Sequence, residues 1–154
     1  MLIFAVSIIY FLGLIWRGDS SIAAYSVTGG SHSTSPASNM FDENMFSQWQ
    51  SASDTGSVIV TFFDRIKLKK VSITARVDCC QERYKGICLY VDETKVVCKA
   101  NDFIPQGGQT IEFSTSINGN IIEVKFPNGH AQIPELWIDY EIIPTTGLYI
   151  YTFL

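Results

Sequence analysis

The sequence has few charged residues and almost no histidine. Lys, Arg, Asp and Glu make up 17% of the 154 residues, the formal net charge is −4, and the two histidines are His32 and His130. Basic residues concentrate nowhere beyond Lys67-Leu68-Lys69-Lys70. A protein that follows the phosphates of a nucleic acid needs a basic face, whereas lysines alternating with apolar residues are typical of the exposed face of a strand. The composition is that of a globular protein, and it argues against a nucleic-acid partner.

The sequence also lacks the residue sets of common metal and catalytic sites. No Cys-x-x-Cys pair lies near a histidine, and His32 and His130 are far apart in the chain, so a zinc site has no support. A Ser-His-Asp or Cys-His pair would need one of these two histidines. His32 lies in a Ser-rich stretch and His130 follows the turn dipeptide Asn128-Gly129, so we expect both in solvated loops. The sequence therefore predicts a protein that is not an enzyme.

Only the first segment is strongly hydrophobic. Leu2 to Trp16 carries no charge but is shorter than the roughly 20 residues of a membrane span, which is typical of a signal-peptide core. Ser21-Ile22-Ala23 before Ala24 offers a small-x-small cleavage site. We therefore expect residues 1–23 to be a signal peptide and the mature protein to be secreted and extracellular. An uncleaved membrane anchor is the alternative.

Export would place the four cysteines in an oxidising environment, where they form disulfides. If Asp92-Glu93-Thr94 is a three-residue hairpin loop, Val91 faces Lys95, Tyr90 faces Val96, Leu89 faces Val97 and Cys88 faces Cys98. Directly opposed strand residues are near disulfide reach, so the hairpin predicts a Cys88–Cys98 bridge. Cys79 and Cys80 are adjacent, and either a constrained disulfide between neighbours or two free buried thiols fits them.

From residue 57 onward the chain shows short strand patterns with no helical period between them and no internal repeat. Each run is bounded by Asp, Asn, Gly or Pro, which favours a β-sandwich or jelly roll. The expected strands are 57–63, 66–76, 86–91, 94–98, 110–113, 120–126 and 135–143, with turns at Asn118-Gly119 and Asn128-Gly129 and a short helix or turn within 39–48.

The two flanks of this region are less defined. Ser26 to Ser38 is rich in Ser, Thr, Gly and Pro and is either a linker or the leading edge of the domain. We therefore expect one β domain over residues 24–143. Residues 144–154 form an apolar tail that is either an edge strand or a partner surface.

The most informative chemistry lies in Arg76-x-Asp78-x4-Arg83. Each arginine presents five donors in a planar fork, and Asp78 can hold one fork in place. A disulfide between the arginines would add an apolar surface for a methyl group, and donors beside such a surface suit a deoxy-sugar. The alternative is a set of surface salt bridges worth at most about 1 kcal/mol each.

These residues resemble a known family. Ile73-Thr74-Ala75-Arg76-Val77-Asp78-Cys79-Cys80-Gln81-Glu82-Arg83 resembles the signature of the fucolectins, or F-type lectins, in which an Arg-x-Asp-x4-Arg run contains adjacent cysteines. Ala37 to Asn44 resembles the family's calcium loop, and Pro134 to Ile138 matches the start of a late strand. The resemblance covers about Ser33 to Ile143.

The resemblance implies an all-β jelly-roll β-sandwich of the galactose-binding-like (discoidin) type. It implies sugar donors at Arg76 and Arg83, with Asp78 beside them and Cys79–Cys80 as the apolar platform. It also implies a structural calcium ion, and calcium takes six to eight oxygen ligands. The implied ligands are Asn39, Asp42, Asn44, Ser53, Glu135 and the backbone carbonyl of Pro134. For Asp42 and Asn44 alone, plain turn chemistry is the alternative.

The sequence departs from the family at one sugar ligand. The family's histidine falls at Trp49, and Gln48 to Thr61 contains no histidine. Trp49 either stacks on a sugar or is a buried aromatic. The family's Asp-Gly-Asn is here Asp42-Glu43-Asn44.

Our hypothesis is a secreted, calcium-stabilised lectin module for glycans with a terminal fucose-like sugar, including those of cell-surface glycoproteins. A single small site binds weakly, so we expect homo-oligomers or repeats. The alternative is a discoidin-like adhesion module that binds protein or membrane surfaces and has lost sugar binding.

Overall fold

The computed structural model describes residues 22–144 as an antiparallel β-structure with two short 3-10 helices. The elements are β1 (Ile22–Thr28), η1 (Ala37–Phe41), β2 (Trp49–Gln50), β3 (Gly56–Thr74), η2 (Gln81–Tyr84), β4 (Cys88–Val91), β5 (Thr94–Cys98), β6 (Thr110–Phe126), β7 (Gln132–Ile133) and β8 (Leu136–Ile142). The predicted all-β class is correct, and the predicted short helix within 39–48 corresponds to η1.

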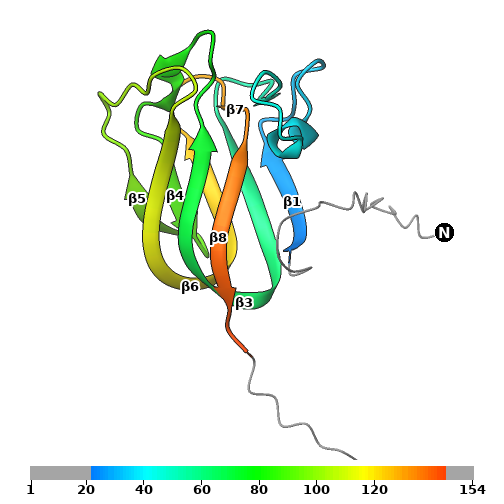
Figure 1. The fold of residues 1–154 in the computed structure, drawn as a ribbon, viewed down its shortest axis with the longest axis vertical. Helices are drawn as coiled ribbons and strands as arrows, with labels where there is room; N and C mark the ends of the chain where they lie inside the picture. The colour runs from blue at the N-terminus through cyan, green and yellow to red at the C-terminus, as the bar shows by residue number, and fades with distance from the viewer. Residues whose placement is uncertain (1–21, 145–154) are drawn as a thin grey trace, which may run out of the picture.

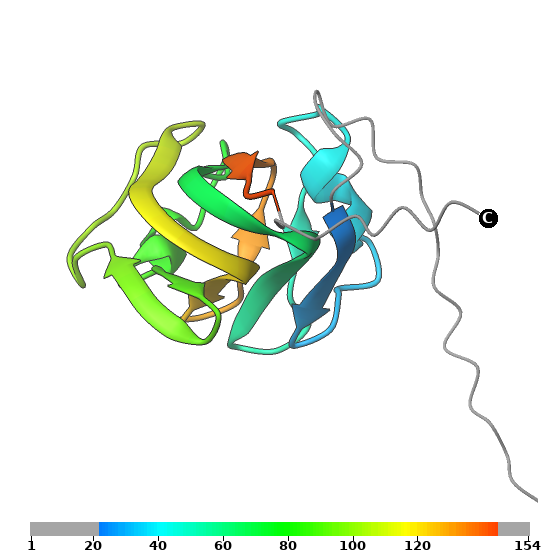
Figure 2. The ribbon, with the colours of Figure 1, turned by 90° about the horizontal axis from the view of Figure 1, so that it is seen from below.

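Two long strands form both layers of the sandwich. The first part of β3 pairs with β1 and with the second part of β6, which in turn pairs with β4 of the β4–β5 hairpin. The second part of β3 pairs with β8 and with the first part of β6. Both strands turn at the lower end of the molecule in Figure 1, and the view from below shows them passing between the layers (Figure 2). The loops that connect β3 to β4 and β6 to β8 therefore lie together at the opposite end.

The sequence patterns predicted two short strands where β3 is continuous. The predicted strands 57–63 and 66–76 are both parts of β3, and their pairing with β6 shifts between Thr61 and Ile66 and again between Leu68 and Lys70. The second shift lets Leu68 and Val71 both face the core with Lys69 and Lys70 between them, because a bulge resets the inward alternation of a strand.

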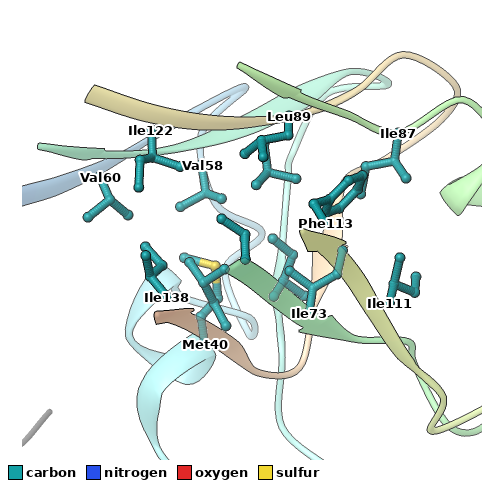
Figure 3. Packing of buried hydrophobic residues seen from close by; sticks show 14 of the residues in the cluster. Met40, Val58, Val60, Ile73, Ile87, Leu89, Ile111, Phe113, Ile122 and Ile138 are labelled. Carbon is teal, nitrogen blue, oxygen red and sulfur yellow. The ribbon is translucent and has the colours of Figure 1, made fainter. Parts of the chain in front are cut away.

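The core fills the space between the layers. Val58, Val60 and Ile122 point inward from one layer and meet Ile73 and Phe113 from the other (Figure 3). Trp49 is fully buried with them, so the interpretation of Trp49 as a buried aromatic is correct. Each such side chain stabilises the fold by about 1.5–3 kcal/mol.

The β4–β5 hairpin carries the predicted disulfide. Cys88 pairs with Cys98, Leu89 pairs with Val97, and a disulfide joins the two cysteines. The predicted three-residue loop is wrong, and so are the pairs it implied for Tyr90 and Val91. The turn is Asp92-Glu93, with φ of 46° and 67°, the positive values of a tight two-residue hairpin turn. Tyr90 pairs with Lys95 and Val91 with Thr94, and a register shift follows Leu89.

The turn predicted at Asn118-Gly119 is also absent, because both residues lie inside β6. A Cβ added at Gly119 would lie 2.3 Å from Val91 Cγ1, so glycine permits close packing where β6 bends. The turn predicted at Asn128-Gly129 does lie between strands, and Gly129 has a φ of 76°.

The structure begins within the segment assigned to the signal peptide. β1 starts at Ile22, so cleavage after Ala23 would remove two residues of that strand. Ser26 to Thr28 belong to β1, which makes this stretch the leading edge of the domain rather than a linker. Residues 1–21 and, within the predicted tail, 145–154 lie outside the described residues. Across residues 22–144 the structure contains no helix that is long and apolar enough to cross a membrane.

Gly119 provides a test of this packing. We expect Gly119→Ala to lower the free energy of unfolding by about 1–3 kcal/mol, because the new methyl group overpacks the contact with Val91. Asn118 is exposed, so Asn118→Ala should change it by less than about 0.5 kcal/mol. Urea denaturation measures both, and equal effects would contradict the packing role.

Candidate functional site

The segment with the two arginines forms a loop at the upper end of the sandwich, between β3 and β4 (Figure 1). We call residues 76–83 the arginine loop. Cys79 and Cys80 form a disulfide within it, and Cys80 adopts a left-handed conformation with φ of 70°. The described residues include all four cysteines and no free thiol, so the alternative of two free thiols is wrong.

Tyr84 anchors the start of the arginine loop. Its hydroxyl accepts a hydrogen bond from the Arg76 backbone N–H at 2.9 Å and donates one to the carbonyl of Gln132 at 3.0 Å. Tyr84 is fully buried, and burial raises the pKa of its hydroxyl, which therefore stays protonated and able to donate. Gln81 adds a third hydrogen bond, in which its side-chain amide donates to the Arg76 carbonyl at 2.9 Å.

Gln132 anchors the other end of the loop. Its side chain is fully buried, and its amide nitrogen donates to the Cys80 carbonyl at 3.0 Å. Its amide oxygen accepts a hydrogen bond from Arg83 Nη1 at 3.3 Å. One buried side chain therefore holds both the cysteine pair and the second arginine against β7. A buried amide that loses its partners costs about 1–3 kcal/mol, so this arrangement constrains the loop.

The two arginines have different surroundings. The Arg76 guanidinium forms a two-point ion pair with Asp78, through Nε and Nη2. This pair lies at the surface and holds the pKa of the Asp78 carboxyl below its usual value. Arg83 runs along the turn at Gly129, where an added Cβ would lie 3.4 Å from Arg83 Cγ. Asp78 thus fixes Arg76, as expected from the sequence, while Gln132 fixes Arg83.

A second cluster of polar side chains lies where the loop after η1 meets the connection between β7 and β8. It contains Asp42, Asn44 and Glu135. Glu135 is 2% exposed, and its Oε1 is buried with no hydrogen-bond partner in the described structure. Burial and the nearby negative charge of Asp42 raise the pKa of Glu135 to about 7. A buried, partnerless carboxylate oxygen beside a second carboxylate is the arrangement that a bound cation relieves.

The remaining predicted metal ligands are Asn39, Pro134 and Ser53. Asn39 lies on η1 and donates to the Gln48 carbonyl at 3.1 Å, and Pro134 is buried next to Glu135. Ser53 lies in a turn with Thr55, to whose carbonyl its hydroxyl donates at 2.7 Å.

Turn chemistry also operates in this region. Asp42 Oδ1 accepts from Asn44 N at 3.0 Å, and Asp42 Oδ2 accepts from Ser47 Oγ at 2.6 Å. The described residues form no cluster of three or more His, Cys, Asp or Glu suited to a metal, so a calcium site here depends on amide and carbonyl oxygens as well.

His130 has more contacts than the sequence predicted. Nδ1 lies 3.0 Å from the Ser51 carbonyl and Nε2 lies 3.2 Å from Asp54 Oδ1. The imidazole therefore joins the turn at Gly129 to the loop after β2. His32 is exposed, as expected.

Sequence analysis missed Tyr84 and Gln132. Tyr84 directly follows the arginine loop, but its aromatic ring gave no signal beyond the general apolar pattern. Gln132 had a detectable signal, because it is a polar residue between apolar Ala131 and Ile133. Polar residues in such positions are buried only when their hydrogen bonds are satisfied.

Comparison with known proteins identifies the fold. The sequence matches no protein-family model, and it matches no curated protein. Among solved structures, a fucolectin from the serum of striped bass, Morone saxatilis, is 21% identical with a TM-score of 0.68. The match covers 80% of this chain and 48% of the fucolectin, so this chain spans about half of that protein.

Two bacterial modules match over most of their own length. The family 32 carbohydrate-binding module of Clostridium perfringens NanJ, solved with galactose, is 19% identical with a TM-score of 0.61, over 77% of this chain and 93% of the module. A Streptococcus pneumoniae fucose binding module is 16% identical with a TM-score of 0.59, over 75% and 89%. This chain spans 34% of a Clostridium perfringens ZmpB structure with two such modules. The predicted β-sandwich is confirmed, and this chain shares its fold with the fucolectin and the two bacterial modules.

Gln132 should dominate the rigidity of the arginine loop. We expect Gln132→Ala to lower the free energy of unfolding by about 1–3 kcal/mol, because the Cys80 carbonyl loses a buried partner. Gln106→Ala, at an exposed loop position, is the matched control and should cost less than about 0.5 kcal/mol. Urea denaturation compares the two variants, and a Gln132 variant as stable as the control would rule out the anchoring role.

Proposed function

We propose that this chain is a secreted, calcium-stabilised carbohydrate-binding module, and that its arginine loop binds a terminal fucose-like sugar. The observation that carries this proposal is the arginine loop itself. Arg76 and Arg83 flank a disulfide between neighbouring cysteines at the loop end of the sandwich, and hydrogen bonds from two buried side chains hold the loop. The proposal assigns the chain no catalytic activity.

The chemistry of the loop suits a deoxy-sugar. Guanidinium groups donate hydrogen bonds in a plane, which matches adjacent hydroxyl and ring oxygens. The Cys79–Cys80 disulfide has no polar hydrogen to donate, so a sugar methyl group can pack on it without burying a donor. Asp78 and Gln132 fix the two arginines beforehand, which reduces the entropy lost on binding.

The similar solved structures agree with a sugar ligand. They include a fucolectin, a fucose binding module and a carbohydrate-binding module in complex with galactose. We extend sugar binding to this chain as a proposal, because the identities are 21% or lower.

A site of this size binds weakly on its own. Each charge-assisted hydrogen bond contributes about 1.5–3 kcal/mol, and the entropy lost on association offsets much of the total. Homo-oligomers that engage several glycans of one cell-surface glycoprotein would raise the apparent affinity by avidity.

Calcium is the proposed structural ion. The donors are oxygens, which calcium prefers, and Glu135 Oε1 provides a buried acceptor without a protein partner. Asn39, Asp42, Asn44 and Glu135 are the proposed side-chain ligands, with Ser53 and the Pro134 carbonyl completing the set. Bound calcium would offset the repulsion between Asp42 and Glu135 and join the loop after η1 to the start of β8.

Secretion is supported by the two disulfides, since such bonds persist in oxidising compartments.

A second candidate function is favoured by exposed apolar side chains in and beside the arginine loop. Met45 is 42% exposed, Phe46 is 89% exposed and Val77 is 41% exposed. An added Cβ at Gly108 would lie 3.8 Å from both Met45 Cε and Val77 Cγ2, so the two loops approach one another. Exposed apolar side chains on loop tips suit adhesion to a protein or membrane surface.

The sugar proposal predicts a specific loss in Arg83→Ala. We expect wild-type protein to bind free fucose in calorimetry with calcium present, and Arg83→Ala to bind at least about tenfold more weakly, because it loses charge-assisted donors. Arg65→Ala is the charge-matched control, since Arg65 is exposed at the bend of β3 far from the loop.

A glycan-binding screen of the same proteins identifies the preferred sugar. If folded wild-type protein with calcium binds neither fucose nor any glycan on the screen, the proposal fails. Cell adhesion that persists in excess free fucose would favour the second candidate.

The calcium proposal predicts stabilisation that depends on Glu135. We expect calcium at about 100 times its dissociation constant to add about 2.7 kcal/mol to the free energy of unfolding, seen as a higher melting temperature. Magnesium, which demands a tighter octahedral geometry, should add much less.

Glu135→Gln separates this effect from general destabilisation. The amide removes a buried charge, so the variant should fold at least as well as wild type in chelator, but it should gain little from calcium. A variant with the full calcium response would exclude Glu135 as a ligand.

A further inference from the structure

A groove of about 460 Å³ lies on the outer face of the layer formed by β1, β3, β6 and β4. This volume is in the range of sites that bind small molecules, about 300–1,000 Å³. Neither Arg76 nor Arg83 lines the groove, so it is separate from the arginine loop.

Strand register brings the lining side chains together. Thr28 pairs with Ser57, Ser57 pairs with Lys125, and Lys125 pairs with Cys88, which forms one row across four strands. Glu123 pairs with Tyr90 in the adjacent row. These side chains point outward because their neighbours along each strand, such as Val58 and Val124, are buried in the core.

A one-way chain of hydrogen bonds crosses the floor of the groove. Ser57 N donates to Thr28 Oγ1 at 2.9 Å, and the two hydroxyl oxygens lie 2.8 Å apart. Ser57 Oγ donates to Glu123 Oε1 at 2.7 Å, so the hydrogen between the hydroxyls comes from Thr28. Ser57 is only 3% exposed, and the chain fixes the Glu123 carboxylate from below.

Lys125 completes the polar floor. Its ammonium lies 3.0 Å from Glu123 Oε2 and 4.4 Å from the centre of the Tyr90 ring. The pair is neutral overall, and it retains unused hydrogen-bonding capacity, because each carboxylate oxygen can accept again and the ammonium has further donors. Acceptors and donors therefore stand side by side in the groove.

This pattern selects the ligand chemistry. An anionic ligand would be repelled by Glu123, and a cationic ligand would be repelled by Lys125. A neutral ligand avoids both repulsions. Two adjacent hydroxyls satisfy the pair, since one donates to the carboxylate while the other accepts from the ammonium. Pro127, Cys88 and the Tyr90 ring line the groove beside these groups and offer apolar contacts for ring C–H groups.

We propose that this groove is a second saccharide-binding site, which takes one or two rings of a neutral sugar through Glu123, Lys125, Thr28 and Tyr90. A chain with the arginine loop and the sheet groove binds sugars on two surfaces. Such a chain cross-links glycans or holds one glycan twice, and it gains avidity without a second copy.

Amide chemical shifts of the full chain test the proposal, with fucose, galactose and lactose as separate probes up to about 50 mM, well above the millimolar range of weak sites. We expect at least one probe to shift the amides of Tyr90, Glu123 and Lys125 in wild type. The shifts should persist in Arg83→Ala, which disables only the arginine loop. Glu123→Gln should weaken the affinity derived from these shifts at least about tenfold. Tyr90→Ala should also weaken it, and this second variant leaves the Glu123–Lys125 ion pair in place.

Lys95→Ala is the matched control, because Lys95 is exposed opposite Tyr90 but does not line the groove. Its affinity should equal that of wild type. Absence of groove shifts with all three probes overturns the proposal, as do groove shifts that Glu123→Gln leaves unchanged. If a sugar shifts the groove amides but not those of the arginine loop, the result would support the groove as a sugar site. The same result would contradict the proposed function of the arginine loop.

Discussion

The hydrogen bonds made by the buried side chains of Gln132 and Tyr84 are the constraint on which the rest of the site depends. The arginine loop carries two charged side chains and a disulfide, and it has no regular structure beyond η2 to hold it. Gln132 and Tyr84 supply the missing order, since they bind the Cys80 carbonyl, Arg83 and the Arg76 backbone from the core side. Because Gln132 and Tyr84 are fully buried, their polar atoms depend on these hydrogen bonds, which favour one conformation of the loop.

The same short segment also organises the neighbouring sites. Gln132 lies on β7, and Glu135 lies three residues later, in the short connection between β7 and β8. The Glu135 carbonyl accepts a hydrogen bond from Thr74 N at 3.0 Å, at the end of β3 where the arginine loop begins. A cation held by Glu135 would therefore stabilise the backbone that leads into the arginine loop. Through this connection the proposed calcium ion would influence the proposed sugar site.

Local patterns predicted much of this architecture from the sequence. Alternation of apolar and polar residues placed most strands, and direct opposition across a hairpin predicted the Cys88–Cys98 bridge. The same patterns failed where a strand bends, because the register shift of β3 between Thr61 and Ile66 and the glycine of β6 packed on Val91 look like strand ends in a linear sequence. Gln132 escaped prediction because its partners are over 45 residues away, and no local pattern encodes such contacts. The groove on the sheet was missed for the same reason, since its residues come from four strands.

The most direct test of the account is a crystal structure of the full chain soaked with fucose in the presence of calcium. The account predicts one sugar at the upper end of the sandwich, with hydroxyl or ring oxygens within hydrogen-bond distance of both Arg76 and Arg83. Its methyl group should contact the Cys79–Cys80 disulfide. A sugar that contacts neither arginine, or an arginine loop that remains empty while fucose is bound elsewhere on the chain, would contradict the central claim.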